Sequence, residues 1–249
     1  MVENMIVQKF GGIAMQDHQN RKLVLARIKK AISIHQKVLV VVSAMGRRGQ
    51  HYATDTLLDL IPSSSSANSV ETDLLSACGE LISASVLCSE LKEAGILATL
   101  LYGKSAGIMT NNAYGDAQIE KVETTSITAA FQQVNCIVVP GFQGLSEETQ
   151  TFTTLGRGGS DLTAVVYGHY LNADVVEFYK NVPGVMTSDP FREKNVQLIS
   201  SMTYEELQHK INGPVEVIQK RAAKFAALHN VPLHIRSLYE DKEGTFVFN

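Results

Sequence analysis

Short apolar runs rich in valine and isoleucine alternate along this chain with longer stretches of helical periodicity. The runs predict buried strands at Met5–Phe10, Val38–Val42, Ile96–Leu101, Cys136–Val139, Val175–Tyr179 and Val231–Ile235. Between them, apolar residues recur at helical spacing and predict helices over roughly Gln19–His35, Val70–Leu91, Ser160–Leu171, Tyr204–Lys210 and Val215–His229. Strands that alternate with helices predict an α/β fold, in which a mostly parallel sheet is covered on both faces.

The composition and net charge indicate a globular protein and bear on whether it binds nucleic acid. The chain has 249 residues, of which 45% are hydrophobic and 19% charged, enough apolar material for one large domain or two small lobes. Its net charge is -3 and it has no run of basic residues, so we expect no nucleic-acid partner.

The N-terminal residues do not have the pattern of a signal peptide, and no apolar run approaches the length of a bilayer span. We therefore expect a cytoplasmic protein without a membrane partner. The cysteines are Cys78, Cys88 and Cys136, which have no CxxC spacing and are expected to be reduced, buried thiols.

Ligands of parallel sheets bind beyond the carboxyl ends of the strands, so the segments that follow strands carry the candidate chemistry. Lys9 and then Gly11-Gly12 follow the first strand, where glycine amides can approach a phosphate closely. A tight turn alone could also require these glycines. Ser43 ends the second strand, where it could contact a ligand or cap the next element.

The segment Thr153–Thr163, with the sequence TTLGRGGSDLT, is the strongest candidate for an active-site loop. Its arginine, Arg157, offers a planar fork that can hold a carboxylate through two hydrogen bonds. Ser160 and Asp161 stand before an apolar helix and could cap it. A later segment, Tyr179–Pro190, could line a nucleotide pocket or serve only as a crossover loop.

Taken together, several segments resemble the catalytic domain of aspartate kinase, within the amino-acid kinase family. They occur in the family's order over nearly the whole chain and read VQKFGG, VVVSAMG, CGELISA, PGFQG, TTLGRGGSD, VPGVMTSDP and NVPLHIRS. The stretch YATDTLL resembles the Gram-positive type of this enzyme. The resemblance implies a three-layer α/β/α sandwich of the carbamate kinase-like type, without the family's C-terminal ACT regulatory domains. It also implies an amino-acid-binding lobe at about 1–155 and a nucleotide-binding lobe at about 156–249.

The family reaction moves the γ-phosphoryl group of ATP to the β-carboxylate of L-aspartate, the first step of lysine, threonine and methionine biosynthesis. By resemblance, Lys9 stabilises the transferred group and Asp161 organises its surroundings. Aspartate would be bound by Ser43, Glu80, Arg157 and Ser160. The nucleotide would be bound by Gly11, Gly12, Gly158, Gly159, Lys180, Asn181 and Glu216. Mg²⁺ would arrive with ATP, without a metal motif of the protein's own, and a homodimer is possible.

The chain departs from the family pattern on the nucleotide side. Ile13-Ala14 replaces Thr-Ser, Lys180-Asn181 replaces Thr-Asp, and Glu216 stands where the family has a lysine beside ATP. Loss of one pre-organised donor at a charged transition state commonly costs about 2.7–4 kcal/mol. Besides an active aspartate kinase, the sequence therefore leaves open a catalytically impaired paralogue that binds a small amino acid or pairs with an active subunit. A kinase for another small acid is a third reading, which the retained substrate-side residues disfavour.

Overall fold

Strands and helices alternate along the part of the chain that the structure, a computed structural model, describes, namely residues 4–62, 68–188, 196–211 and 217–249. The strands are β1 Met5–Phe10, β2 Lys37–Val42, β3 Ala98–Leu100, β4 Ile108–Thr110, β5 Ile119–Val122, β6 Cys136–Pro140, β7 Gln143–Ser146, β8 Phe152–Thr154, β9 Val175–Lys180, β10 Ser201–Met202, β11 Leu233–Ser237 and β12 Thr245–Val247. The α-helices are α1 Gly12–Met15, α2 His18–Ile34, α3 Thr54–Leu58, α4 Val70–Glu93, α5 Thr125–Ala130, α6 Gly159–Tyr170, α7 Tyr204–Ile211 and α8 Lys220–His229.

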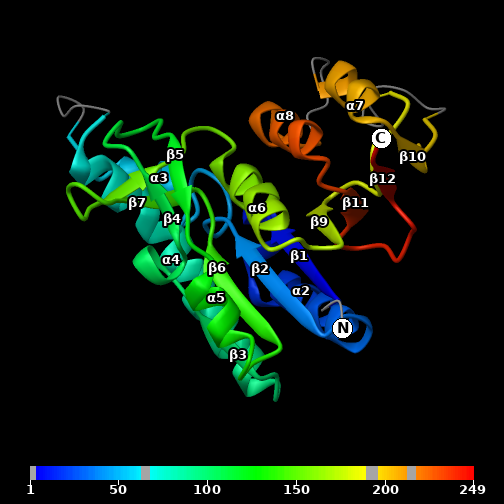
Figure 1. Ribbon diagram of the computed structural model, residues 1–249, viewed down its shortest axis with the longest axis horizontal. Helices are drawn as coiled ribbons and strands as arrows, with labels where there is room; N and C mark the ends of the chain where they lie inside the picture. The colour runs from blue at the N-terminus through cyan, green and yellow to red at the C-terminus, as the bar shows by residue number, and fades with distance from the viewer. Residues whose placement is uncertain (1–3, 63–67, 189–195, 212–216) are drawn as a thin grey trace.

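Within those described residues the strands form an eight-stranded sheet and a smaller four-stranded sheet (Figure 1). The order in the large sheet is β10-β12-β11-β9-β1-β2-β6-β3, and every neighbouring pair is parallel except β11 and β12. The small sheet has the order β5-β4-β7-β8. All six strands predicted from the apolar runs lie in the large sheet, so the mostly parallel α/β fold is confirmed.

Helices cover both faces of the large sheet, and successive residues of the central strands point to opposite faces. Ile6 and Val40 belong to an apolar cluster with α2 and α4, whereas Val7 and Val41 belong to one with α6 and α8. Every residue of β1 and β2 is consequently buried. This is the burial expected of strands covered on both faces, and it gives the three-layer α/β/α arrangement.

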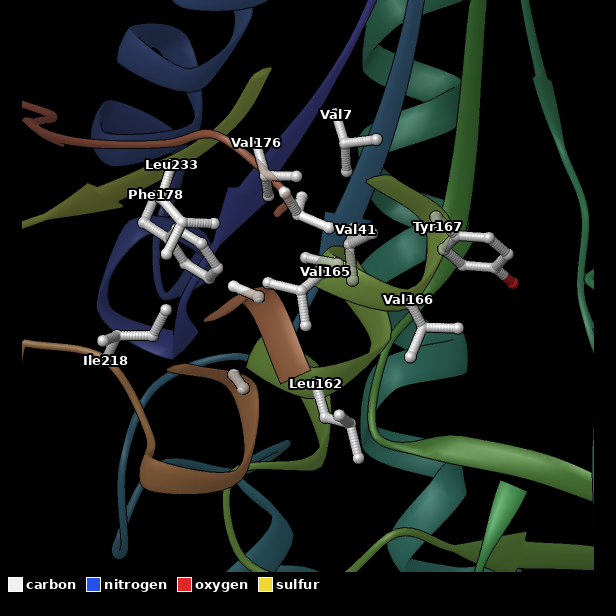
Figure 2. Packing of buried hydrophobic residues seen from close by; sticks show 14 of the residues in the cluster. Val7, Val41, Leu162, Val165, Val166, Tyr167, Val176, Phe178, Ile218 and Leu233 are labelled. Carbon is white, nitrogen blue, oxygen red and sulfur yellow. The ribbon is translucent and has the colours of Figure 1, made fainter. Parts of the chain in front are cut away.

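Helix α6 is the most deeply buried of the covering helices, and Figure 2 shows its side chains next to those of β1, β2 and β9. Val165 and Val166 contribute to this core, together with the strand residues Val7 and Val176. Gly168 lets the helix approach β9 closely, because a Cβ atom there would collide with the side chain of Val176. Close packing of α6 holds its first turn at the edge of the sheet.

The small sheet was not predicted from the sequence. Its strands are only a few residues long, and β5 has no buried residue, so no clear apolar run marks them. Polar contacts join them instead: the hydroxyls of Thr110 and Thr153 lie 2.5 Å apart between β4 and β8. Such cross-strand pairs depend on tertiary register, which sequence periodicity does not reveal. The short strands β10 and β12 and the short helices α1, α3 and α5 were also missed, because segments of this length carry no clear periodicity.

One predicted helix begins later than expected. Helix α8 starts at Lys220 instead of Val215, and positions 215 and 216 lie outside the described residues. Val217 and Ile218 are buried in the core without helical structure. The backbone N–H of Gln219 donates to the Asp161 carboxylate at 3.2 Å. Core packing and this tertiary hydrogen bond therefore override the helical propensity of the segment.

The expectation that no segment approaches a bilayer span was wrong for α4. Among the described residues, this helix is long and apolar enough to cross a membrane by length and composition alone. Half of the apolar window is buried in the protein, where Ala84, Leu87 and Leu91 pack against the sheet. The apolar residues are accounted for by the core, and the helix also carries the buried acids Asp73 and Glu80.

Tyr167 provides a direct test of how α6 is joined to the rest of the fold. Its fully buried hydroxyl donates to the carbonyl oxygen of Ala106 at 2.6 Å. We expect Tyr167→Phe to lower the free energy of unfolding by about 1–3 kcal/mol, because the buried carbonyl loses its partner. Urea denaturation followed by circular dichroism measures this. The control is Tyr170→Phe on the exposed side of the same helix, and equal stability of the two variants would contradict the assignment.

Candidate functional site

A cavity of about 170 Å³ opens at the edge of the large sheet where β1, β2 and β9 end. These strands are neighbours and run parallel, so their carboxyl ends meet there, as expected for a ligand site in a parallel sheet. The cavity is lined by Gly11, Gly12, Ile13, Ala14, Gly46, Arg47, Tyr179, Lys180, Asn181, Leu238 and Tyr239. The sequence-predicted residues Gly11, Gly12, Lys180 and Asn181 are thus brought together.

A buried carboxylate is held between two lysines at this edge. Asp161, in the first turn of α6, has its Oδ1 atom 2.7 Å from the Nζ of Lys9 and its Oδ2 atom 3.4 Å from the Nζ of Lys180. The backbone N–H of Gln219 also donates to Oδ2. Burial alone would raise the pKa of Asp161, but Lys180 and Lys9 outweigh it and keep that pKa well below its ordinary value. The carboxylate is therefore ionised and fixes both ammonium groups.

The glycine pair beside Lys9 leaves the backbone bare. A Cβ atom on Gly11 would lie 3.6 Å from the Nζ of Lys9, directly over the ammonium group. On Gly12 it would collide with the carbonyl oxygen of Gly46. The N–H of Gly46 in turn donates to the carbonyl of Gly12 at 2.8 Å, so the loops after β1 and β2 are locked together. Close approach of two backbones therefore requires glycine at position 12, whereas a Cβ atom at position 11 would make an ordinary contact. The absence of both side chains leaves room for a ligand over Lys9.

Glu80, on α4, is the second acid of the site. Its Oε1 atom accepts from the backbone N–H of Ala44 at 3.1 Å, beside the half-buried Ser43. Its Oε2 atom is buried and has no hydrogen-bond partner among the described residues. Burial raises the pKa of Glu80 to about 8, although the Ala44 N–H and the charge of Lys9 act in the opposite direction. A buried carboxylate oxygen without a partner is suited to accept from a cationic ligand.

Arg157 lies in the loop between β8 and α6 and has an exposed side chain. Its guanidinium makes no hydrogen bond or ion pair within the described parts of the chain. Gly158 adopts a positive φ of 79°, a conformation suited to glycine, and a Cβ atom on Gly159 would crowd Phe142. Ser160 is buried against Gly141. Arg157 lies in the loop before α6 and Ser160 in the first turn of α6, and within the described residues no hydrogen bond or ion pair joins either of them to Glu80.

Two anchors outside the predicted set hold this loop. The buried Asp73 carboxylate, on α4, accepts from the N–H of Thr154 at 2.7 Å, from its hydroxyl at 3.0 Å and from the N–H of Gly115. From the other side, Arg221 at the start of α8 donates to the carbonyl of Leu155 at 2.7 Å. The loop that carries Arg157 is therefore tied to both α4 and α8.

A buried polar network supports the wall formed by Tyr179. Glu177 accepts from Arg236 at 2.9 Å, from the Gln8 amide at 2.8 Å and from the Tyr179 hydroxyl at 3.0 Å. Burial opposes ionisation of Glu177, but His234, Gln8 and Arg236 together lower its pKa to about 2. The network spans β1, β9 and β11 and holds the tyrosine ring against the site.

Arg27 of α2 supports the same wall. Its guanidinium donates to the carbonyls of Leu238 and Glu240 and forms an ion pair of 2.8 Å with Asp241. Leu238 and the following Tyr239 line the cavity. Since Leu238 packs in the same apolar cluster as α2, a helix on that face of the sheet holds this part of the wall.

Sequence reasoning found most, but not all, of the groups at this site. Glu216 lies outside the described residues. Tyr179 begins the segment that was predicted as a possible pocket lining, and it does line the cavity. Residues that the sequence did not single out are Arg47, Asp73, Gln219, Arg221, Leu238 and Tyr239. Arg47 stands directly after the SAMG segment and could have been noticed as a cation beside a candidate phosphate loop. Asp73 and Arg221 act through long-range contacts and carry no local signal.

Comparison with known proteins shows what the chain is similar to. The model of the family described as "Amino acid kinase family" matches residues 4–237. Aspartokinase 1 of Bacillus subtilis is 42% identical over 243 residues, which cover 97% of this chain and 60% of the relative. Aspartokinase of Geobacillus stearothermophilus is 38% identical with similar coverage. The chain therefore spans about 60% of the length of these curated relatives.

Solved structures give the same picture. Aspartate kinase from Synechocystis superposes with a TM-score of 0.83 and 33% sequence identity, over 98% of this chain and 40% of that one. The E. coli aspartokinase III structure "in complex with aspartate and ADP" has a TM-score of 0.80 at 21% identity, over 99% of this chain and 65% of that one. At this lower identity the likeness shows the fold alone. UMP kinase from Ureaplasma parvum, at 17% identity and a TM-score of 0.70, matches over the whole of both chains.

The raised pKa of Glu80 predicts a pH dependence of stability. Since the folded state holds this proton up to about pH 8 and the unfolded state releases it near its ordinary pKa of 4.5, raising the pH between these values destabilises the fold. We expect Glu80→Gln to remove this loss, which amounts to at most about 1.4 kcal/mol per pH unit. Urea denaturation at several pH values between 5 and 8, with Glu93→Gln on the exposed end of α4 as control, measures it. Parallel stability curves for wild type and Glu80→Gln would refute the assignment.

Proposed function

Because this chain belongs to the amino acid kinase family, we propose that it transfers the γ-phosphoryl group of ATP to the β-carboxylate of L-aspartate. The observation that carries the proposal is the pair of lysines, Lys9 and Lys180, held on Asp161 beside the bare Gly11-Gly12 backbone. The similarity to aspartokinases supports the choice of substrate, and one of these, E. coli aspartokinase III, is described in complex with aspartate and ADP. The reaction would be the first step of lysine, threonine and methionine biosynthesis.

We assign the amino-acid end of the site to Glu80, Arg157, Ser43 and Ser160. The unpartnered oxygen of Glu80 suits the substrate ammonium group, and the pairing would offset the cost of burying this carboxylate. The exposed Arg157 fork suits the α-carboxylate. The hydroxyls of Ser43 and Ser160 would complete the hydrogen bonds. These groups distinguish an amino acid from a simple carboxylic acid, since both charged ends are bound.

The transfer itself needs positioning and charge neutralisation more than acid–base chemistry, because a carboxylate is already a competent nucleophile. Lys9 lies next to the bare glycines and would neutralise charge on the transferred phosphoryl group. Asp161 keeps Lys9 in place, and its two oxygens face the ammonium groups of Lys9 and Lys180. It acts as the organising residue, and the chemistry rests on the lysine and the amides of Gly11 and Gly12.

The remaining assignments concern the nucleotide and its metal. We assign Lys180, Asn181, Gly158, Gly159 and Glu216 to the nucleotide, on a lobe of about residues 156–249, with the amino acid on a lobe of about 1–155. Asp161, whose partner Lys180 lines the cavity, is already occupied by two lysines, so the residues fit a Mg²⁺ ion that would arrive with ATP and would be held by phosphates and water. When bound, the ion supplies charge neutralisation. A cytoplasmic location and a homodimer remain predictions.

A second candidate function rests on the apolar lining of the cavity. Ile13 and Ala14 line it where the resembled family has hydroxyl residues, so hydrogen bonds toward a phosphate are lost. This favours a catalytically impaired paralogue that binds a small amino acid or pairs with an active subunit. The retained Lys9, paired with Asp161, favours the active enzyme, which we therefore place first.

The two candidates differ in turnover and in nucleotide binding. We expect ATP- and aspartate-dependent release of ADP, measured in a coupled assay, with a loss of at least about 100-fold in Lys9→Ala because a charged transition-state donor is removed. Lys22→Ala, on the exposed face of α2, is the control. Aspartate binding by calorimetry without ATP binding or turnover would contradict the kinase and favour the paralogue.

The role of Glu80 predicts a proton released on aspartate binding. If burial keeps Glu80 protonated below about pH 8, then pairing with the ammonium group must expel that proton, and affinity for aspartate should rise between pH 6 and 8. Calorimetry in two buffers of different ionisation enthalpy measures the proton count directly. In Glu80→Gln we expect both the proton release and the pH dependence to vanish. Proton release that persists in this variant would reject the ammonium site.

A further inference from the structure

An arginine outside the proposed catalytic and binding residues stands at the cavity. Arg47 follows Gly46 in the loop after β2 and lines the cavity together with Gly11, Gly12 and Lys180. Its side chain is exposed and makes no ion pair or hydrogen bond with the described residues. The next residue, Arg48, differs in both respects: it is not among the lining residues and lies 3.7 Å from the carboxylate of Asp59.

The loop that carries Arg47 is built to hold its position. Gly46 adopts a φ of 83° and is bonded to Gly12 across the floor of the cavity. The backbone N–H of Arg47 donates to the Gln50 side chain at 2.8 Å, and the N–H of Gln50 donates back to the carbonyl of Arg47 at 2.9 Å. Because these hydrogen bonds fix the backbone of Arg47, they also fix the position from which its side chain extends.

The described residues that line the cavity are partly cationic. Arg47 and Lys180 carry positive charge, and no acidic residue is among these described lining residues. Lys9, which is paired with Asp161, lies next to the bare Gly11-Gly12 backbone. A cavity with a cationic lining and a bare glycine backbone is suited to a polyanion, because cations in a cleft attract one and its charge offsets their repulsion.

We propose that Arg47 binds the phosphate chain of the nucleotide from the wall formed by the loop after β2, sharing it with Lys180. This inference rests on the proposed function, and it adds a binding residue that the family resemblance did not supply. Chemically, the planar guanidinium can hold two phosphate oxygens at once, whereas a lysine offers a point charge. Arg47 thereby provides a second cation at the cavity mouth, where Ile13 and Ala14 provide no hydroxyl.

The test compares two adjacent arginines in the full chain. We expect Arg47→Gln to raise the KM for ATP, and the dissociation constant for ATP measured by calorimetry, by roughly tenfold or more, as for loss of one charge-assisted hydrogen bond. The KM for aspartate should stay unchanged. Arg48→Gln should leave all three constants unchanged, and Arg47→Lys should recover part of the affinity. Equal constants in Arg47→Gln and Arg48→Gln would overturn the proposal.

Inorganic tripolyphosphate separates this inference from the proposed function. We expect the wild-type chain to bind it in a salt-dependent manner, and Arg47→Gln to bind it more weakly with a shallower salt dependence, whether or not the chain turns over aspartate. Tripolyphosphate binding that is lost in Arg47→Gln, in a chain without kinase activity, would keep the anion site and reject the kinase. Undiminished binding in Arg47→Gln, or no binding by the wild type, would reject the anion site itself.

Discussion

The rest of the site depends on one buried carboxylate, Asp161, shared by Lys9 and Lys180. Removing a charge from water is costly, so an acid in this position is stable only if cations and hydrogen-bond donors surround it. That requirement brings three separate parts of the chain together: the end of β1, the end of β9 and the first turn of α6. It also draws in Gln219, whose N–H completes the shell and delays the start of α8. The carboxylate of Asp161 thus joins these segments of the fold, in addition to its role in the proposed site.

Around this junction the fold separates two kinds of environment. On one side the cavity is cationic and partly open, with a bare glycine backbone, Arg47 and Lys180. On the other side Glu80 is enclosed by α4 and the loop after β2, and burial changes its ionisation. A polyanion suits the first environment and an ammonium group suits the second. The proposed transfer between a nucleotide and an amino acid follows from this contrast, with Lys9 at the boundary between the two.

The groups that face the cavity are supported from a distance. Asp73 and Arg221 hold the Arg157 loop from α4 and α8, and Glu177 and Arg27 hold the wall that contains Tyr179 and Leu238. Nearly all of these supports are charged or polar groups that hydrogen-bond backbone carbonyls or amides. Because such bonds are lost when either partner moves, they keep loops that lack regular structure in one arrangement. The sheet fixes the positions at which the loops begin, and these hydrogen bonds fix the conformations of the loops.

The sequence by itself determined the layered part of the molecule. Short runs of β-branched apolar residues are typical of strands buried on both faces, so β1, β2, β6 and β9 and the longer helices α2, α4 and α6 were predictable. It also identified two short segments, Lys9 with the glycine pair and Arg157 to Asp161. In each segment, charged residues and glycines lie close together along the chain. The small sheet, the late start of α8, the apolar role of α4 and the anchoring by Asp73 and Arg221 were decided only in the tertiary structure. Each depends on contacts between residues far apart in the chain, whose energies outweigh local propensity and leave no periodic trace in the sequence.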